Sequence, residues 1–220
     1  MFYVFEANLS VMEKSKKNTT LDNILNVAHN LFLSRGFSAT SVDEICKNAK
    51  ITKGGFFHYF KSKECLAKDV LKRFCSDSQD DMRQAGCCEK IEDPLERVFA
   101  LLDGIPGHIA HKSKHRGCLI TTFIQELSQT HPEIQNLCVK GLNKWASMLK
   151  NDLKLAQEKY APNAKIDVNS LANYCVTVIE GAQILAKANG KSKTFDESIR
   201  HLKTYLTMVF KPKQRGGRYE

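Results

Sequence analysis

The sequence predicts an all-α protein of about nine helices, and three observations support this prediction. Apolar residues recur at the helical spacings i, i+3, i+4 and i+7 through most of the chain. Turn-forming residues separate these periodic segments, and no stretch shows the convincing alternation of a half-buried strand. Only five prolines and twelve glycines occur among 220 residues, which leaves room for long helices.

Four helices are expected in the first third of the chain. The first begins at Thr19 or Thr20, which suit an N-cap, and ends at Gly36. Ser41 and Glu44 have the spacing of a capping box at the start of the second helix. The other expected boundaries are caps at Thr52 and Ser62 and ends near Ala49 and Tyr59.

Longer helices are expected in the remaining two thirds. The last two cover about residues 167–189 and 195–210, and both have broad apolar faces. The predicted breaks, in chain order, are Gly86 to Pro94, Pro106-Gly107, His131-Pro132, a loop over 160–165, Gly190 and Pro212.

The cysteines and the chain start indicate a cytoplasmic protein. The eight cysteines lack regular spacing and include no C-x-x-C pair, so they fit reduced core residues better than structural zinc. Residues 1–6 lack the features of a signal peptide, and no run of about 18 apolar residues predicts a membrane span. Residues 1–11, before a second methionine at Met12, are either an extension upstream of the natural start or a disordered arm.

Two short helices joined by a tight turn predict a helix-turn-helix, a motif that places its second helix in the DNA major groove. The helix starts at Ser41 and Thr52 would offer free backbone amides to phosphates. Gly54 and Gly55 would allow close approach of the backbone to a partner. Lys63 stands at a helix start, where a cation is unfavourable for the helix dipole, which makes sense if it faces a phosphate.

Over roughly residues 20–66 the chain resembles the tetracycline-repressor-like (TetR) family. The resemblance rests on Ile24 to Phe37, Ala39 to Ile45 and Ile51 to Leu66. Where the family usually has a tyrosine, this chain has Phe57, so one phosphate contact through a hydroxyl is in doubt. The DNA-contacting positions that the resemblance implies are Thr40, Thr52, Lys53, Gly54, Gly55, Phe57, His58, Tyr59 and Lys63.

The resemblance also implies a larger helical domain that binds a small effector and forms a homodimer through its last two helices. The expected organisation is a flexible arm (1–18), a DNA-binding domain (19–65), an effector-binding and dimerisation domain (66–210) and a basic tail (211–220). The residues assigned to the dimer interface are Ala172, Val176, Ile179, Gln183, Leu202 and Leu206.

An apolar effector pocket is expected between helices of the larger domain. Its candidate lining residues, each also consistent with ordinary core packing, are Phe99, Leu102, Ile105, Cys118, Phe123, Leu127, Trp145 and Cys175. Cys118 follows three basic residues near a helix start, an environment that lowers a thiol pKa and suggests electrophile or redox sensing as an alternative to an apolar effector site. His108, His111 and His115 fit a solvated basic patch as well as a metal site.

The expected function is ligand-responsive transcription regulation. A dimer would bind a pseudo-palindromic operator in double-stranded DNA and release it when an effector binds. The rival class, an enzyme, is unsupported because no phosphate loop, dinucleotide motif, nucleophile elbow or paired metal ligands occur, so we expect no cofactor and no metal. A non-specific architectural DNA binder fits poorly with residues 76–210, which hold seventeen basic and sixteen acidic residues.

Overall fold

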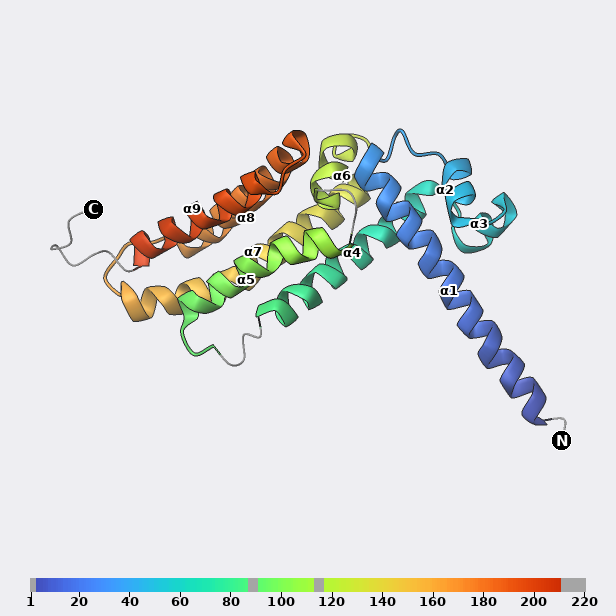
Figure 1. The fold of residues 1–220 in the computed structure, drawn as a ribbon, viewed down its shortest axis with the longest axis horizontal. Coiled ribbons are helices and arrows are strands. Elements are labelled where there is room, and N and C mark those ends of the chain that lie inside the picture. The colour runs from blue at the N-terminus through green and yellow to red at the C-terminus, as the bar shows by residue number, and fades with distance from the viewer. Residues whose placement is uncertain (1–2, 87–90, 113–116, 211–220) are drawn as a thin grey trace.

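The computed structural model describes the backbone of residues 3–86, 91–112 and 117–210, and the side chains of residues 19–77, 91–105 and 117–210. The described residues form nine α-helices and contain no strand, which confirms the predicted fold class. The helices are α1 (Tyr3–Arg35), α2 (Val42–Ala49), α3 (Lys53–Tyr59), α4 (Lys63–Gly86), α5 (Pro94–Lys112), α6 (Leu119–Leu127), α7 (Pro132–Tyr160), α8 (Val168–Asn189) and α9 (Lys193–Phe210) (Figure 1).

The helices form two groups that α4 connects. Helices α1, α2 and α3 lie together at one end with the start of α4; we call this group the N-terminal bundle (Figure 1). The rest of α4 packs against α5 and α7, and α8 packs against both α7 and α9. Helix α6 lies between the groups and contacts α1, α4 and α7, so it links the N-terminal bundle to the larger C-terminal domain.

The N-terminal bundle forms because α1, α2 and α3 each bury one face in a shared core. Ile24, Ala28 and Phe32 recur every four residues on α1 and are fully buried. Ile45 of α2 and Phe56 of α3 are also fully buried in this core. Burying each of the larger side chains stabilises the bundle by about 1.5–3 kcal/mol, which holds two short helices that would be marginal alone.

Most of the predicted helix boundaries are confirmed, and two are wrong. Gly36 and Gly190 follow α1 and α8 with φ of +85° and +66°, as helix-ending glycines do. Helix α1 does not begin at Thr19 or Thr20 but runs from Tyr3, because no proline or glycine lies between them. Helix α5 does not break at Pro106-Gly107 but continues to Lys112. An interior proline removes a hydrogen bond and crowds the preceding turn, so packing of α5 against α4 and α7 must offset this cost.

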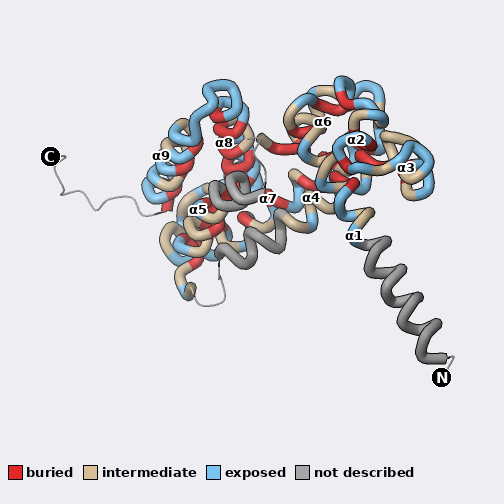
Figure 2. Tube along the Cα trace, turned by 45° about the vertical axis from the view of Figure 1, so that its right-hand side comes forward, coloured by how far each residue is buried: buried red, intermediate tan, exposed pale blue. Residues whose placement is uncertain are grey.

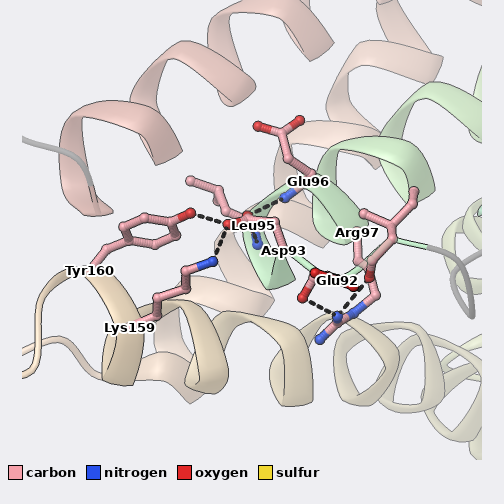
Figure 3. Close-up of polar contacts among 8 residues, drawn as sticks. Glu92, Asp93, Leu95, Glu96, Arg97, Lys159 and Tyr160 are labelled. Atoms are coloured by element: carbon pink, nitrogen blue, oxygen red, sulfur yellow. Dashed lines mark hydrogen bonds and ion pairs between the residues drawn. The ribbon is translucent and has the colours of Figure 1, made fainter.

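One carboxylate ties the start of α5 to the end of α7 (Figure 3). Asp93 Oδ1 accepts the backbone N–H groups of Leu95 (2.9 Å) and Glu96 (3.0 Å), and Oδ2 accepts from Lys159 Nζ (2.8 Å) and the Tyr160 hydroxyl. Burial opposes ionisation of Asp93, but these hydrogen bonds outweigh it and hold its pKa well below the usual range. The carboxylate is therefore an N-cap and an interhelical tie at once.

Candidate DNA interface

The turn between α2 and α3 has the geometry that the capping residues predict. Ser41 Oγ accepts the Glu44 N–H at 3.1 Å to start α2, and Thr52 Oγ1 accepts the Gly55 N–H at 3.0 Å to start α3. Lys50 lies between the helices with φ of +56°, a left-handed conformation that closes α2. These caps fix α3 relative to α2 in a helix-turn-helix arrangement.

The predicted capping box at Ser41 forms only in part. The Glu44 carboxylate pairs with Arg35 at the end of α1, where it braces α2 against α1. A solvent-exposed ion pair of this kind contributes about 0–1 kcal/mol, so its main effect is on the position of α2.

Helix α3 buries one face and exposes the other. Phe56 and the following Phe60 anchor the helix in the core at 0% and 4% exposure, whereas Phe57 is 50% exposed. Figure 2 shows α3 at the periphery of the N-terminal bundle, away from the C-terminal domain. The predicted contact residues that are exposed or partly exposed on this surface are Thr52, Lys53, Gly54, Gly55, Phe57, His58 and Tyr59.

The Lys53 ammonium group can exchange its intrachain partner for an external anion. Lys53 Nζ pairs with Asp43 at 2.9 Å, and both side chains are more than half exposed. Such a pair is weak in water, so a phosphate could replace Asp43 at little free-energy cost.

Nothing in the described part of the chain explains the absence of a side chain at Gly54. A Cβ atom there would meet the Thr52 Oγ1 atom at 3.9 Å, an ordinary van der Waals distance. At Gly55 the same oxygen would lie at 3.3 Å, a tighter contact. The space beside Gly54 is therefore open to an external partner.

Two of the predicted contact residues take internal roles instead. Thr40 is fully buried and donates its hydroxyl proton to the Gly36 carbonyl at 2.7 Å, so its side chain does not reach the surface. Lys63 Nζ donates to the Phe37 and Thr40 carbonyls, both at 2.8 Å, and lies 4.1 Å from the centroid of the Phe37 ring. Burial lowers the pKa of Lys63. The sequence predicts that the Lys63 ammonium faces a phosphate, but in the structure it is bound to backbone carbonyls of its own chain.

The residues predicted for the dimer interface lie in the core of the single chain and not on its surface. All six assigned residues, Ala172, Val176, Ile179, Gln183, Leu202 and Leu206, are buried within the single chain. They lie where α8 and α9 pack against each other and against α7. The prediction could not separate the two sides of α8 because both are apolar.

A second apolar face of α8 and α9 points to solvent. Tyr174 and Tyr205, one on each helix, bring their rings to 5.4 Å. Leu185 and Met208 are 52% and 59% exposed, and Ile184, next to Leu185 in sequence, is 45% exposed. Large side chains exposed together in this way are typical of a protein interface. The spacing of Tyr174, Gly181 and Leu185 was the signal that would have identified this face.

The predicted pocket residues do not share one environment. Seven of the eight, Leu102, Ile105, Cys118, Phe123, Leu127, Trp145 and Cys175, are no more than 7% exposed. Phe123 packs against Phe32 and Phe37 of the N-terminal bundle, at ring centroid distances of 5.5 and 6.2 Å. Phe99 instead lines a cleft of about 500 Å³ between α5 and α9.

The sensing alternative at Cys118 finds no support in the surroundings of the thiol. Cys118 is the N-cap residue of α6, as expected, but it is 3% exposed. Burial, with the neighbouring Glu180 carboxyl, raises the pKa of the thiol well above its usual value. The three basic residues before Gly117 lie outside the described residues, as do the side chains of His108, His111 and His115.

Among the described side chains of the C-terminal domain, two buried polar atoms lack hydrogen-bond partners. They are Oε1 of Glu180 and Nε1 of Trp145. Burial raises the pKa of Glu180, although its other oxygen accepts a hydrogen bond from the Thr121 hydroxyl. Buried polar atoms are satisfied in nearly all proteins, so these two atoms are candidate positions for a bound water or ligand.

Within the described part of the chain, no helix is long and apolar enough to cross a membrane. The described side chains also include no cluster of three His, Cys, Asp or Glu residues placed to hold a metal ion.

Comparisons with known proteins agree with this architecture. A family model described as "Bacterial regulatory proteins, tetR family" matches residues 24–70, and one described as "Tetracyclin repressor-like, C-terminal domain" matches residues 94–202. The chain is 26% identical over 180 residues to the HTH-type transcriptional repressor DhaR of Mycobacterium sp. strain GP1, which covers 82% of this chain and 85% of that protein. It is 22% identical over 198 residues to the HTH-type transcriptional repressor NemR of Escherichia coli K12, covering 89% and 98%.

A solved structure shares the same fold. The crystal structure of a TetR transcriptional regulator from Chloroflexus aurantiacus J-10-FL matches this chain with a TM-score of 0.78 at 21% identity. The match covers 88% of this chain and 96% of the other. The likeness therefore extends through both the N-terminal bundle and the C-terminal domain.

Proposed function

The chain belongs to the TetR family of bacterial transcription regulators, and on this premise we propose that it is a dimeric repressor that releases its operator when a small effector binds. The observation that carries the proposal is the exposed surface of α3, which combines Lys53, an exposed Phe57 and a glycine with no internal role. A short helix with this surface suits entry into the major groove of double-stranded DNA.

Dimerisation is supported by the exposed apolar face of α8 and α9. Two chains paired through this face would bury Leu185, Tyr205 and Met208 and present two copies of α3. Two copies about 34 Å apart reach successive major grooves on one side of DNA, which favours a symmetric operator. We therefore assign the interface to this face and not to the buried residues that the sequence predicts for it.

An effector site in the C-terminal domain is supported by the unpartnered atoms of Glu180 and Trp145. An effector that donates a hydrogen bond to Glu180 or accepts one from Trp145 would relieve the cost of leaving each atom unsatisfied, about 1–3 kcal/mol. This function needs no enzymatic step, and we place the protein in the cytoplasm, where its operator lies.

Selection of DNA fragments from the parent genome tests the proposal. The purified dimer should enrich a short symmetric sequence and bind it with a Kd of about 10⁻⁸ M or lower at physiological salt. A panel of small metabolites should contain at least one that releases this fragment, and Glu180→Gln should change the effector concentration that this release requires. Recovery of no shared sequence would contradict a specific operator.

A further inference from the structure

The turn that joins α1 to α2 is held by a carboxylate from the C-terminal domain. Glu126 of α6 accepts the backbone N–H of Phe37 at 3.2 Å through Oε1 and that of Ser38 at 2.9 Å through Oε2. Glu126 is 89 positions from Phe37 and 88 from Ser38 in the sequence, so both hydrogen bonds are tertiary contacts. A carboxylate that accepts two N–H groups fixes both the position and the direction of the turn.

A lysine of α8 holds the end of α1. Lys187 Nζ donates to the Leu33 carbonyl at 2.9 Å. Leu33 is in the last turn of α1, where carbonyl groups have no partner within the helix and where the helix dipole favours a cation. Helix α8 therefore contacts the N-terminal bundle through the Lys187 side chain, 154 positions away from Leu33 in the sequence.

Glycines shape the same joint. Gly36 has φ of +85°, and a Cβ atom there would lie 1.8 Å from Glu126 Oε1, so a side chain would displace the carboxylate. Gly117, just before α6, has φ of +129°, and its Cβ would lie 3.3 Å from Lys187 Cδ and 3.6 Å from Leu33 Cδ1. Both glycines leave room for the two charged side chains to reach the turn.

Helix α8 also holds the start of α6. Glu180 accepts a hydrogen bond from Thr121, and seven residues later on the same face Lys187 reaches α1. The exposed Ile184 and Leu185 of the proposed dimer face lie between them in sequence. A shift of α8 would therefore act on α6 and α1 together.

We propose that Glu126 and Lys187 are positioning residues that set the angle between the N-terminal bundle and α8. The turn from Gly36 to Ser41 is then the joint through which a change in the C-terminal domain reaches α3. This inference rests on the proposed function, because the angle matters only if two bundles must match one DNA duplex.

Substituting Lys187 tests the joint in the full-length dimer. Lys187→Met removes the donor but keeps the side-chain length, Lys187→Arg keeps a donor, and Lys191→Met is the matched control at an exposed lysine beyond α8. A spin label on a non-natural amino acid at exposed position 47 reports the distance between the two bundles without using the native cysteines. Operator affinity and the melting temperature are measured on the same proteins.

Lys187→Met should broaden the distance distribution and weaken operator binding about tenfold, with the dimer intact and the melting temperature nearly unchanged. Lys187→Arg should restore both, and Lys191→Met should match the wild type. Glu126→Gln, which has one acceptor oxygen for two N–H groups, should broaden the distribution too. Unchanged distances and affinity in Lys187→Met and Glu126→Gln would overturn the joint. If the wild type bound no operator, the proposed function would fail. The distances between spin labels in the wild type and the variants would still show whether Glu126 and Lys187 set the angle of the bundle.

Discussion

Gly54 separates DNA binding from folding at the scale of one residue. Because a Cβ atom at this position meets nothing closer than 3.9 Å, Gly54→Ala should leave the fold intact. Alanine in a helix should even raise the free energy of unfolding, by up to about 1 kcal/mol. If DNA approaches the backbone here, the same methyl group should weaken operator binding about tenfold or more.

Thermal unfolding and operator titration of the same Gly54→Ala sample check this prediction. Ser147→Ala, at an exposed position on α7, is the control and should leave operator affinity unchanged. A stable Gly54→Ala protein with wild-type operator affinity would place DNA away from the start of α3.

Lys63 distinguishes a structural cation from one that binds phosphate. With its ammonium bonded to two backbone carbonyls, Lys63→Met should lower the free energy of unfolding by about 1–3 kcal/mol. Lys61→Met, at an exposed neighbour, should not. The slope of log Kd against log salt should stay at its wild-type value in Lys63→Met. A slope reduced by about 2 for the dimer would restore the phosphate contact first predicted from the sequence.

Asp93 predicts a defined pH dependence of stability. Its folded pKa is depressed, so its contribution is present above the unfolded pKa of about 3.9 and is lost as pH falls through the lower folded pKa. Asp93→Asn keeps a good N-cap but loses the charge facing Lys159, and should cost about 1 kcal/mol at pH 7.

Urea unfolding from pH 7 to pH 3 measures this effect. The difference between wild type and Asp93→Asn should be constant at neutral pH and should shrink below about pH 4. Lys159→Met should remove part of the same pH dependence, since Lys159 is one of the partners of the carboxylate. A difference that stays constant down to pH 3 would contradict the role given to the Asp93 charge.

The sequence predicted single-residue features where the partners are local. The caps at Ser41, Thr52 and Ser62 all bond backbone N–H groups three residues ahead, which spacing alone can reveal. It failed for Thr40 and Lys63, whose family-like positions implied DNA contacts. Their actual partners depend on how α1, α2 and α4 pack, which no local pattern encodes.

At the scale of helices, α8 shows that an apolar pattern does not distinguish a core-facing stripe from a solvent-facing one. Its buried stripe contains Ile179, at 2% exposure, and its solvent-facing stripe contains Leu185, at 52%. Both stripes contain apolar residues at helical spacing, so the sequence alone does not distinguish them. Ile179 was among the residues predicted for the dimer interface. Because it is buried, Ile179→Glu would place a charge in the core and unfold the domain, so this substitution cannot test dimerisation.

Leu185→Glu tests the proposed dimer face. The charge enters an exposed position, so the chain should stay folded but repel its partner across the two-fold interface. Light scattering should show monomers, and operator binding should be lost with the dimer. Leu155→Glu, at an exposed leucine on α7, is the matched control and should remain a dimer. A dimeric Leu185→Glu protein would exclude this face of α8.

For the whole molecule, the sequence predicted the fold class and the helix-turn-helix because several independent signals agreed there. Caps, glycines, periodicity and the family resemblance all fall between Ser41 and Lys63. The C-terminal domain lacked such agreement. The predicted pocket residues are apolar, as core residues are, and only tertiary packing separates Phe99 at a cleft from Phe123 at the contact with the N-terminal bundle.

A hydroxyl-radical footprint of the dimer on its selected operator tests the central claim most directly. If two copies of α3 read one duplex, the footprint should show two symmetric protected half-sites, with centres about one or more whole helical turns apart on one side of the DNA. The exposed surface of α3 and the dimer face of α8 and α9 both predict this pattern. A single protected half-site, or uniform protection along the fragment, would contradict a symmetric dimeric repressor.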